Sequence, residues 1–169
     1  MTNTRIHVIV VMGVAGAGKT TTGRALADAL GWQFYDADEF HTREHIEKMS
    51  HGHPLTDDDR RPWLEALCAL VAGVIQRNDH AVLACSALKQ WYRDAVVPKN
   101  ADSGAVRFVH LDVPVAELRR RLETRHHYFK PELLDSQLAT LETPRDAFIV
   151  DGTRPVEDIV ATVRAALNV

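Results

Sequence analysis

The chain has 169 residues, of which 46% are hydrophobic, and a formal net charge of −3. This length and apolar content suit one domain with a proper core and leave no room for a second catalytic domain. The slightly acidic balance predicts no nucleic-acid partner, and the longest apolar run is far below the ~20 residues that cross a bilayer, so we expect no membrane partner.

The start of the chain and the cysteines bear on location. Residues 1–7 carry no signal-peptide pattern, so we expect a cytoplasmic protein. Cys68 and Cys85 lie inside apolar segments without metal-ligand spacing, which favours buried free thiols over a redox role. Neither cysteine is expected to carry the function.

The first predicted elements are a strand over residues 6–12, a glycine-rich loop and a helix over residues 19–30. The loop, GVAGAGKT, matches every fixed position of the phosphate-binding pattern GxxxxGK[ST]. Its glycines let backbone N–H groups wrap a polyanion, Lys19 reaches the β- and γ-phosphates, and the Thr20 hydroxyl coordinates Mg²⁺. The residues expected to bind ATP here are Gly13, Val14, Ala15, Gly16, Ala17, Gly18, Lys19, Thr20 and Thr21.

Strand-like and helix-like segments alternate along the rest of the chain. This alternation predicts an α/β fold of three layers, a parallel sheet of about five strands with helices on both faces. The further predicted strands are 32–35, 81–85, 106–111 and 147–150, and the further predicted helices are 42–49, 60–77, 89–96, 115–123, 132–141 and 155–167.

The second predicted strand ends in two carboxylates, Asp36 and Asp38. In an extended chain both point to the same side, and ligands of open α/β sheets collect at the carboxyl ends of the strands. We assign Asp38 as the base or hydroxyl-orienting group of a phosphoryl transfer and Asp36 to Mg²⁺ through water. The alternative is that both are ordinary strand-end or capping residues.

The segment 41–60 that follows is too polar for a core. Capping of the next helix is a sufficient explanation for at least one carboxylate of its acidic run, residues 57–59. Lys48 stands four residues after Glu44 and suits a solvated helix pair. His41 and Arg60 are the better substrate candidates in this segment.

The third strand also ends in polar residues. Ser86, Lys89 and Arg93 follow its apolar run and suit a small acceptor that has hydroxyl groups and a negative charge. No Asn/Lys/Asp motif for reading a guanine base is found, which argues against a GTPase switch.

A basic cluster near residue 121 is the last candidate. Arg121 and Arg125 lie four residues apart on one helical face and could close over the phosphates, stabilising the transition state and excluding water. The alternative is an exposed basic helix face. His126 and His127 have no carboxylate or cysteine at ligand spacing, so no zinc site is predicted.

Taken together, these residues resemble the gluconate kinases (gluconokinases) of the P-loop type, relatives of shikimate kinase and the nucleoside monophosphate kinases. The likeness spans nearly the whole chain. The segments 52–64 and 86–89 are more specific than the phosphate loop, because adenylate kinases and shikimate kinases lack them. The matching motifs are GVAGAGKT at 13–20, DADEFH at 36–41, IEKM at 46–49, GHPLTDDDRRPWL at 52–64, CSALK at 85–89, YR at 92–93, and RL at 121–122 leading to Arg125.

The resemblance implies a single P-loop kinase domain over residues 1–169, with a substrate-binding helical segment at about 41–64 and a small lid at about 119–133. It implies transfer of the ATP γ-phosphate to the terminal hydroxyl of D-gluconate, giving 6-phospho-D-gluconate and ADP, in a homodimer. It also implies that the adenine is bordered by Pro155. The implied catalytic residues are Lys19, Asp38, Arg121 and Arg125, and the implied substrate-binding residues are Asp36, Asp38, His41, Lys48, Arg60, Ser86, Lys89, Arg93 and His127.

The predicted lid departs from the family pattern. The family reads Arg-x-Gly-His-Phe, whereas residues 125–129 read RHHYF, so the glycine is missing and His127 follows Arg125 one residue sooner. His127 is matched to the family histidine. Two other functions stay open from the residues alone: an ATP-dependent kinase of another small hydroxy acid, and a nucleotide-binding regulatory module that transfers no phosphate.

Overall fold

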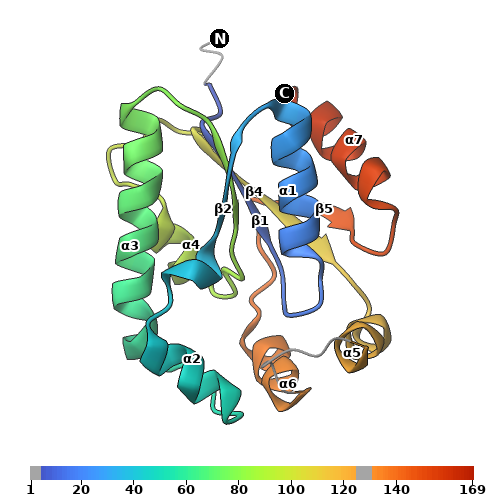
Figure 1. Ribbon diagram of the computed structural model, residues 1–169. Helices are drawn as coiled ribbons and strands as arrows, with labels where there is room; N and C mark the ends of the chain where they lie inside the picture. Colours follow the sequence, from blue (N-terminus) through green and yellow to red (C-terminus); the bar gives the residue numbers. More distant parts are fainter. Residues whose placement is uncertain (1–4, 125–130) are drawn as a thin grey trace.

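The structure, a computed structural model, describes residues 5–124 and 131–169. Its centre is one sheet of five parallel strands in the order β2-β3-β1-β4-β5 (Figure 1). The predicted fold class is therefore confirmed. The strands are β1 Val8–Met12, β2 Gln33–Asp36, β3 Ala81–Ala84, β4 Val106–Asp112 and β5 Phe148–Asp151.

Helices connect these strands, and each predicted helix is present with its ends shifted by at most a few residues. One short 3₁₀ helix, η1 Ala37–Phe40, was not predicted. Within the described ranges, none of the helices has the length and apolar content needed to cross a membrane. The α-helices are α1 Lys19–Leu30, α2 Arg43–Ser50, α3 Asp57–Gln76, α4 Gln90–Val96, α5 Val115–Glu123, α6 Pro131–Thr140 and α7 Val156–Leu167.

The strand order decides which face each helix covers. The chain runs outward from β1 to β2, returns to β3, and then crosses β1 to reach β4. Crossover connections between parallel strands are right-handed, so a reversal of direction moves the connecting helix to the other face. Accordingly α1 lies on one face, while α3 and α4 pack together on the other; α7, which follows the last strand, packs against α1 (Figure 1).

The core lies on both faces of the central strands. All five residues of β1 are buried, as expected for a parallel strand that is covered on two sides. Helix α1 lies unusually close to the sheet at Gly23, where a Cβ atom would come within 2.8 Å of the Phe34 ring. This close approach fixes α1 against β2, next to the carboxylate that ends this strand.

Helix α3 begins before the predicted start at Arg60. The Thr56 hydroxyl accepts a hydrogen bond from the Asp59 N–H at 3.1 Å, and the Asp59 carboxylate accepts one from the Thr56 N–H at 2.8 Å. This reciprocal pair is a capping box, which satisfies two N–H groups at the helix start. The prediction that the acidic run caps this helix is confirmed for Asp59.

Candidate active site

The phosphate loop connects the end of β1 to the start of α1. Gly16 and Gly18 have φ angles of 82° and 93°, which residues with a side chain rarely adopt. The loop can therefore turn its backbone N–H groups toward one point, where the N-terminus of α1 adds its positive dipole end. Lys19 donates to the Val14 carbonyl oxygen at 3.0 Å, so its ammonium group lies beside the loop.

A cavity of about 480 Å³ opens beside this loop at the carboxyl ends of the strands. It is lined by the phosphate loop, the end of β2, the 3₁₀ helix η1, the start of α3 and the segment after β3. Most of the candidate residues predicted from the sequence meet here, as sheet topology requires of groups at neighbouring strand ends. The predicted residues in the lining are Ala15, Gly16, Gly18, Lys19, Thr20, Thr21, Asp36, Asp38, His41, Arg60 and Ser86.

Thr20 and Asp36 form the part of the cavity that suits Mg²⁺. The Thr20 hydroxyl donates to the Asp36 carboxylate at 2.7 Å, so two hard oxygen ligands stand side by side. Over residues 5–124 and 131–169, no group of three or more His, Cys, Asp or Glu side chains could hold a metal ion. This donor set fits an ion that takes most of its ligands from phosphate and water, as Mg²⁺ does.

Asp38 reaches the cavity by a different route from the predicted one. The chain does not stay extended past Asp36 but turns into η1, and the Asp36 carboxylate caps this turn by accepting from the Asp38 N–H at 3.0 Å. The Asp38 side chain is 66% exposed, and its Oδ1 lies 3.8 Å from Nε2 of His41. Its position therefore depends on a turn that Asp36 stabilises.

Trp63 of α3 and His41 hold this turn from behind. The Trp63 indole N–H donates to the Ala37 carbonyl oxygen at 2.7 Å, and the His41 ring stacks on the indole with centroids 4.5 Å apart. Burial lowers the pKa of His41 to about 4, assisted by the positive charges of His45 and Arg60 and opposed by Asp36. The His41 imidazole is therefore neutral near pH 7.

The neutral His41 predicts a stability that depends on pH. Below a pH of about 6.5 the unfolded chain protonates this imidazole, whereas the folded chain does so only near pH 4, so acid favours unfolding. The contribution is fully present above about pH 6.5 and is lost as the pH falls toward 4. We expect His41→Gln to lessen the fall in unfolding free energy between about pH 7.5 and 5 by about 2 kcal/mol, measured by urea unfolding.

A matched control is His53→Gln, which replaces an exposed histidine of the following loop. Each variant is compared with the parent chain, so the contributions of the other titrating groups to the pH dependence of the unfolding free energy cancel. Equal pH slopes for His41→Gln and the parent chain would contradict the prediction.

Five cavity residues were not predicted as site residues. Trp63 falls within the predicted helix 60–77 and has no predicted site role; the available signal is that the indole N–H of a buried tryptophan needs an acceptor. For Gln137 the sequence held no signal. The unpredicted lining residues are Met49, Leu55, Trp63, Leu122 and Gln137.

Two predicted lysines do not line the cavity. Lys48 donates to Asp59 at 2.7 Å and Lys89 donates to Asp57 at 3.0 Å, so both bind the acidic start of α3. Hydrogen bonds from Tyr92 and then Lys89 lower the pKa of Asp57. The pairing of Lys48 with Glu44 that the spacing allowed is replaced by this contact across elements, and both lysines position α3 beside the cavity.

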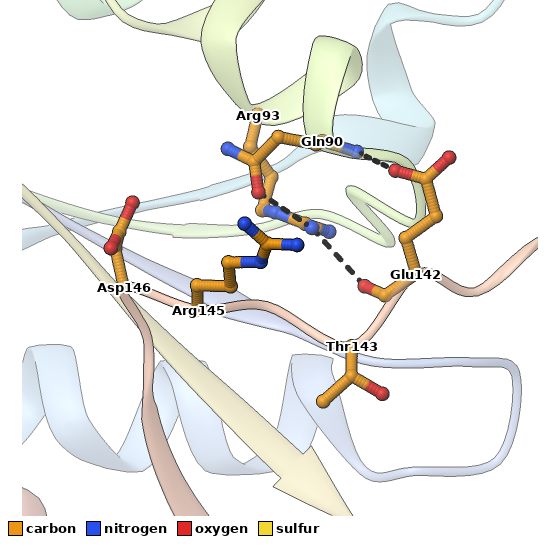
Figure 2. Close-up of a pocket in the computed structure, with 6 residues that line it drawn as sticks. All are labelled: Gln90, Arg93, Glu142, Thr143, Arg145 and Asp146. Carbon is orange, nitrogen blue, oxygen red and sulfur yellow. Dashed lines mark hydrogen bonds between the residues drawn. The ribbon is translucent and has the colours of Figure 1, made fainter.

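Arg93, predicted as a substrate-binding residue, is not part of the cavity lining. Its guanidinium is buried and donates to the carbonyl oxygens of Ala87, Leu88 and Glu142 at 2.8, 3.1 and 3.1 Å. Figure 2 shows Arg93 in a separate surface hollow, between Gln90 and Glu142. Through these backbone contacts and a further hydrogen bond to the Gln90 side chain at 3.0 Å, Arg93 holds the segment after β3 in place, outside the cavity lining.

Arg121 contacts the phosphate loop from outside the cavity. It donates to the carbonyl oxygens of Gly16, Ala17 and Gly152 at 3.1, 3.4 and 2.9 Å, and to Glu117 at 2.8 Å. These contacts brace the phosphate loop, and the predicted role of Arg121 toward the phosphates stays a prediction. The remaining predicted residues are Gly13, Val14, Ala17 and Pro155, which do not line the cavity, and Arg125 and His127, which lie outside the described residues.

The arrangement is that of a P-loop kinase, because an exposed carboxylate in an open cavity beside a phosphate loop suits the transfer of a phosphoryl group to a hydroxyl. A family model described as an AAA domain matches residues 8–144. A gluconokinase from Gluconobacter oxydans (strain 621H) is 47% identical over 139 residues, which cover 82% of this chain and 76% of that protein. The chain therefore belongs to the gluconokinase family, as its motifs indicated.

Solved structures agree with this assignment. A gluconokinase from Sinorhizobium meliloti 1021 is 40% identical and superposes with a TM-score of 0.82, covering 98% of this chain and 94% of that one. A shikimate kinase from Aquifex aeolicus is 18% identical with a TM-score of 0.64, covering 95% of this chain and 96% of that one. The second likeness shows the shared fold alone.

Proposed function

We propose that the protein is an ATP-dependent gluconokinase that phosphorylates the terminal hydroxyl of D-gluconate, giving 6-phospho-D-gluconate and ADP. The observation that carries the proposal is the single cavity lined by both the phosphate loop and the carboxylate Asp38. The family membership supplies the substrate, since the relatives described above are gluconokinases.

The reaction places the acceptor between the terminal phosphate and Asp38. The acceptor oxygen forms a bond to the γ-phosphorus, the bond from that phosphorus to the β,γ-bridging oxygen breaks, and ADP leaves with the bonding electrons. The hydroxyl proton passes to the Asp38 carboxylate. Lys19 and the loop N–H groups stabilise the charge on the phosphoryl oxygens.

Mg²⁺ would be held by Thr20 and, through water, by Asp36. When bound, it neutralises phosphate charge and so lowers the barrier to attack by the acceptor. The contact between Thr20 and Asp36 at 2.7 Å supports this assignment, because it brings a hydroxyl and a carboxylate to one place.

The carboxylate and hydroxyl groups of gluconate require cationic and polar partners. Arg60 is the cation of α3 in the cavity lining, where it donates to the Leu55 carbonyl oxygen and to the Tyr92 hydroxyl, and it is our candidate for the substrate carboxylate. His41 and Ser86 offer neutral hydrogen-bonding groups for the hydroxyls. We further propose a homodimer in the cytoplasm, on the resemblance stated above.

The direct test is an assay that couples ADP release to an optical signal, with ATP, Mg²⁺ and a panel of acceptors. We expect turnover with D-gluconate and much weaker turnover with glucose, shikimate and nucleoside monophosphates. Preference for another hydroxy acid would move the assignment to a different kinase, and ATP binding without turnover of any acceptor would indicate a regulatory module.

A further inference from the structure

Gln137 of α6 makes an unexpected contact with the phosphate loop. Its side-chain carbonyl oxygen accepts a hydrogen bond from the Ala15 N–H at 2.8 Å, across 122 residues of sequence. Ala15 lies inside the glycine-rich loop, whose N–H groups serve phosphate oxygens in P-loop proteins. A carboxamide oxygen therefore stands where the loop offers a donor to an anion.

Docking of α6 does not require this contact. Leu133 and Leu134 are 3% and 0% exposed, so the helix is anchored by its apolar side. Asp135 adds an ion pair to Arg119 of α5 at 2.6 Å. Gln137 instead lines the cavity together with Lys19 and Asp38, on the side of the helix that faces the proposed reaction.

The chemistry of a carboxamide allows two states at this position. It carries an acceptor oxygen and two N–H donors on one planar group, so a turn of the group exchanges one for the other. In the first state the oxygen binds the Ala15 N–H, as seen here. In the second state a phosphate oxygen takes that N–H, and the Gln137 amide donates to the same phosphate.

We propose that Gln137 is a phosphate-binding residue that exchanges these two states, occupying the loop while no nucleotide is bound and donating to the terminal phosphate of ATP when it arrives. This inference rests on the proposed function, because it takes the cavity to be the ATP site. It deepens that function by adding a donor for the phosphate that is transferred, from an element outside the loop.

Two variants of the 169-residue chain distinguish the two states of Gln137. Gln137→Glu keeps the size and the acceptor for Ala15 but replaces the donor with a negative charge, so we expect the Kd for AMP-PNP, a non-hydrolysable ATP analogue, to rise by about 10- to 100-fold. Gln137→Met keeps the size and removes both functions, so we expect kcat to fall by about 10-fold while ADP binds as well as, or better than, before. Calorimetric titration and steady-state kinetics measure these values.

Asp135→Asn is the matched control, since it breaks the ion pair between α5 and α6 without changing the cavity lining. We expect it to leave the ratio of ADP to AMP-PNP affinity unchanged. An equal effect of all three variants would assign the result to docking of α6 and overturn the inference. Variants that bind and turn over like the parent chain would also overturn it.

Measurements on the parent chain distinguish a failure of the Gln137 inference from a failure of the proposed function. If the unmodified protein binds AMP-PNP and phosphorylates gluconate while the Gln137 variants match it, only the role of Gln137 is wrong. If the unmodified protein binds no nucleotide, the proposed function and this inference fall together.

Discussion

Replacement of Lys19 with methionine is expected to lower kcat for gluconate phosphorylation on the order of 10³-fold. The Lys19 ammonium lies beside the phosphate loop, 3.0 Å from the Val14 carbonyl oxygen, and lines the cavity. Its charge would act on the β- and γ-phosphates where negative charge moves during transfer. Methionine keeps the length of the side chain and removes only this charge, so the loss should lie in turnover with the fold retained.

The matched control is Lys99→Met, an exposed lysine that lines a different hollow between α4 and β4. It should leave kcat unchanged. The coupled assay gives kcat, and thermal unfolding shows whether each variant is folded. A folded Lys19→Met protein with near-normal turnover would show that the Lys19 charge is not needed for the transfer and would refute its assigned role.

Asp38→Asn is expected to lower kcat by about 10²- to 10⁴-fold, the range for loss of a general base. The amide of asparagine keeps the shape and the exposed position of the Asp38 side chain, but it cannot take up the proton of the gluconate hydroxyl. Because the side-chain cap of η1 comes from Asp36, the turn should persist in the variant. Binding of AMP-PNP, measured by calorimetry, should therefore stay close to that of the parent chain.

Two comparisons sharpen this test. Asp58→Asn changes a carboxylate that is 93% exposed and pairs with Arg61 on α3, so it should have no effect on turnover. Asp36→Asn should instead raise the Mg²⁺ concentration needed for half-maximal rate, because Asp36 is assigned to the metal. If Asp38→Asn kept nearly full activity while Lys19→Met had none, Asp38 would not be the base.

The sequence was sufficient for the parts of the protein that depend on local pattern. Alternating apolar segments identified the strands and helices, and the loop at residues 13–20 identified the phosphate site, because glycine spacing and helix periodicity are properties of short segments. Since parallel strands all end on one edge of the sheet, the order of elements along the chain was enough to predict that the strand-end residues Asp36 and Ser86 share one cavity.

The sequence was less reliable for residues whose role depends on a partner distant in the chain. Arg93 and Lys89 carry the charges expected of substrate ligands, yet Arg93 binds backbone oxygens and Lys89 binds Asp57. A basic side chain forms a contact with whichever oxygen the fold brings within reach, and sequence spacing does not reveal that oxygen. The contact of Arg121 with the Gly16 carbonyl oxygen was likewise not visible in the sequence.

By itself, the sequence determined the fold class, the phosphate loop and the family, because each is encoded in contiguous residues. Only the tertiary structure decided which cations face the cavity, how η1 turns Asp38 into it, and that Gln137 reaches the Ala15 N–H across 122 residues. The physical reason is that hydrogen bonds are short and directional, so these assignments need atomic positions that the packing of several elements sets jointly.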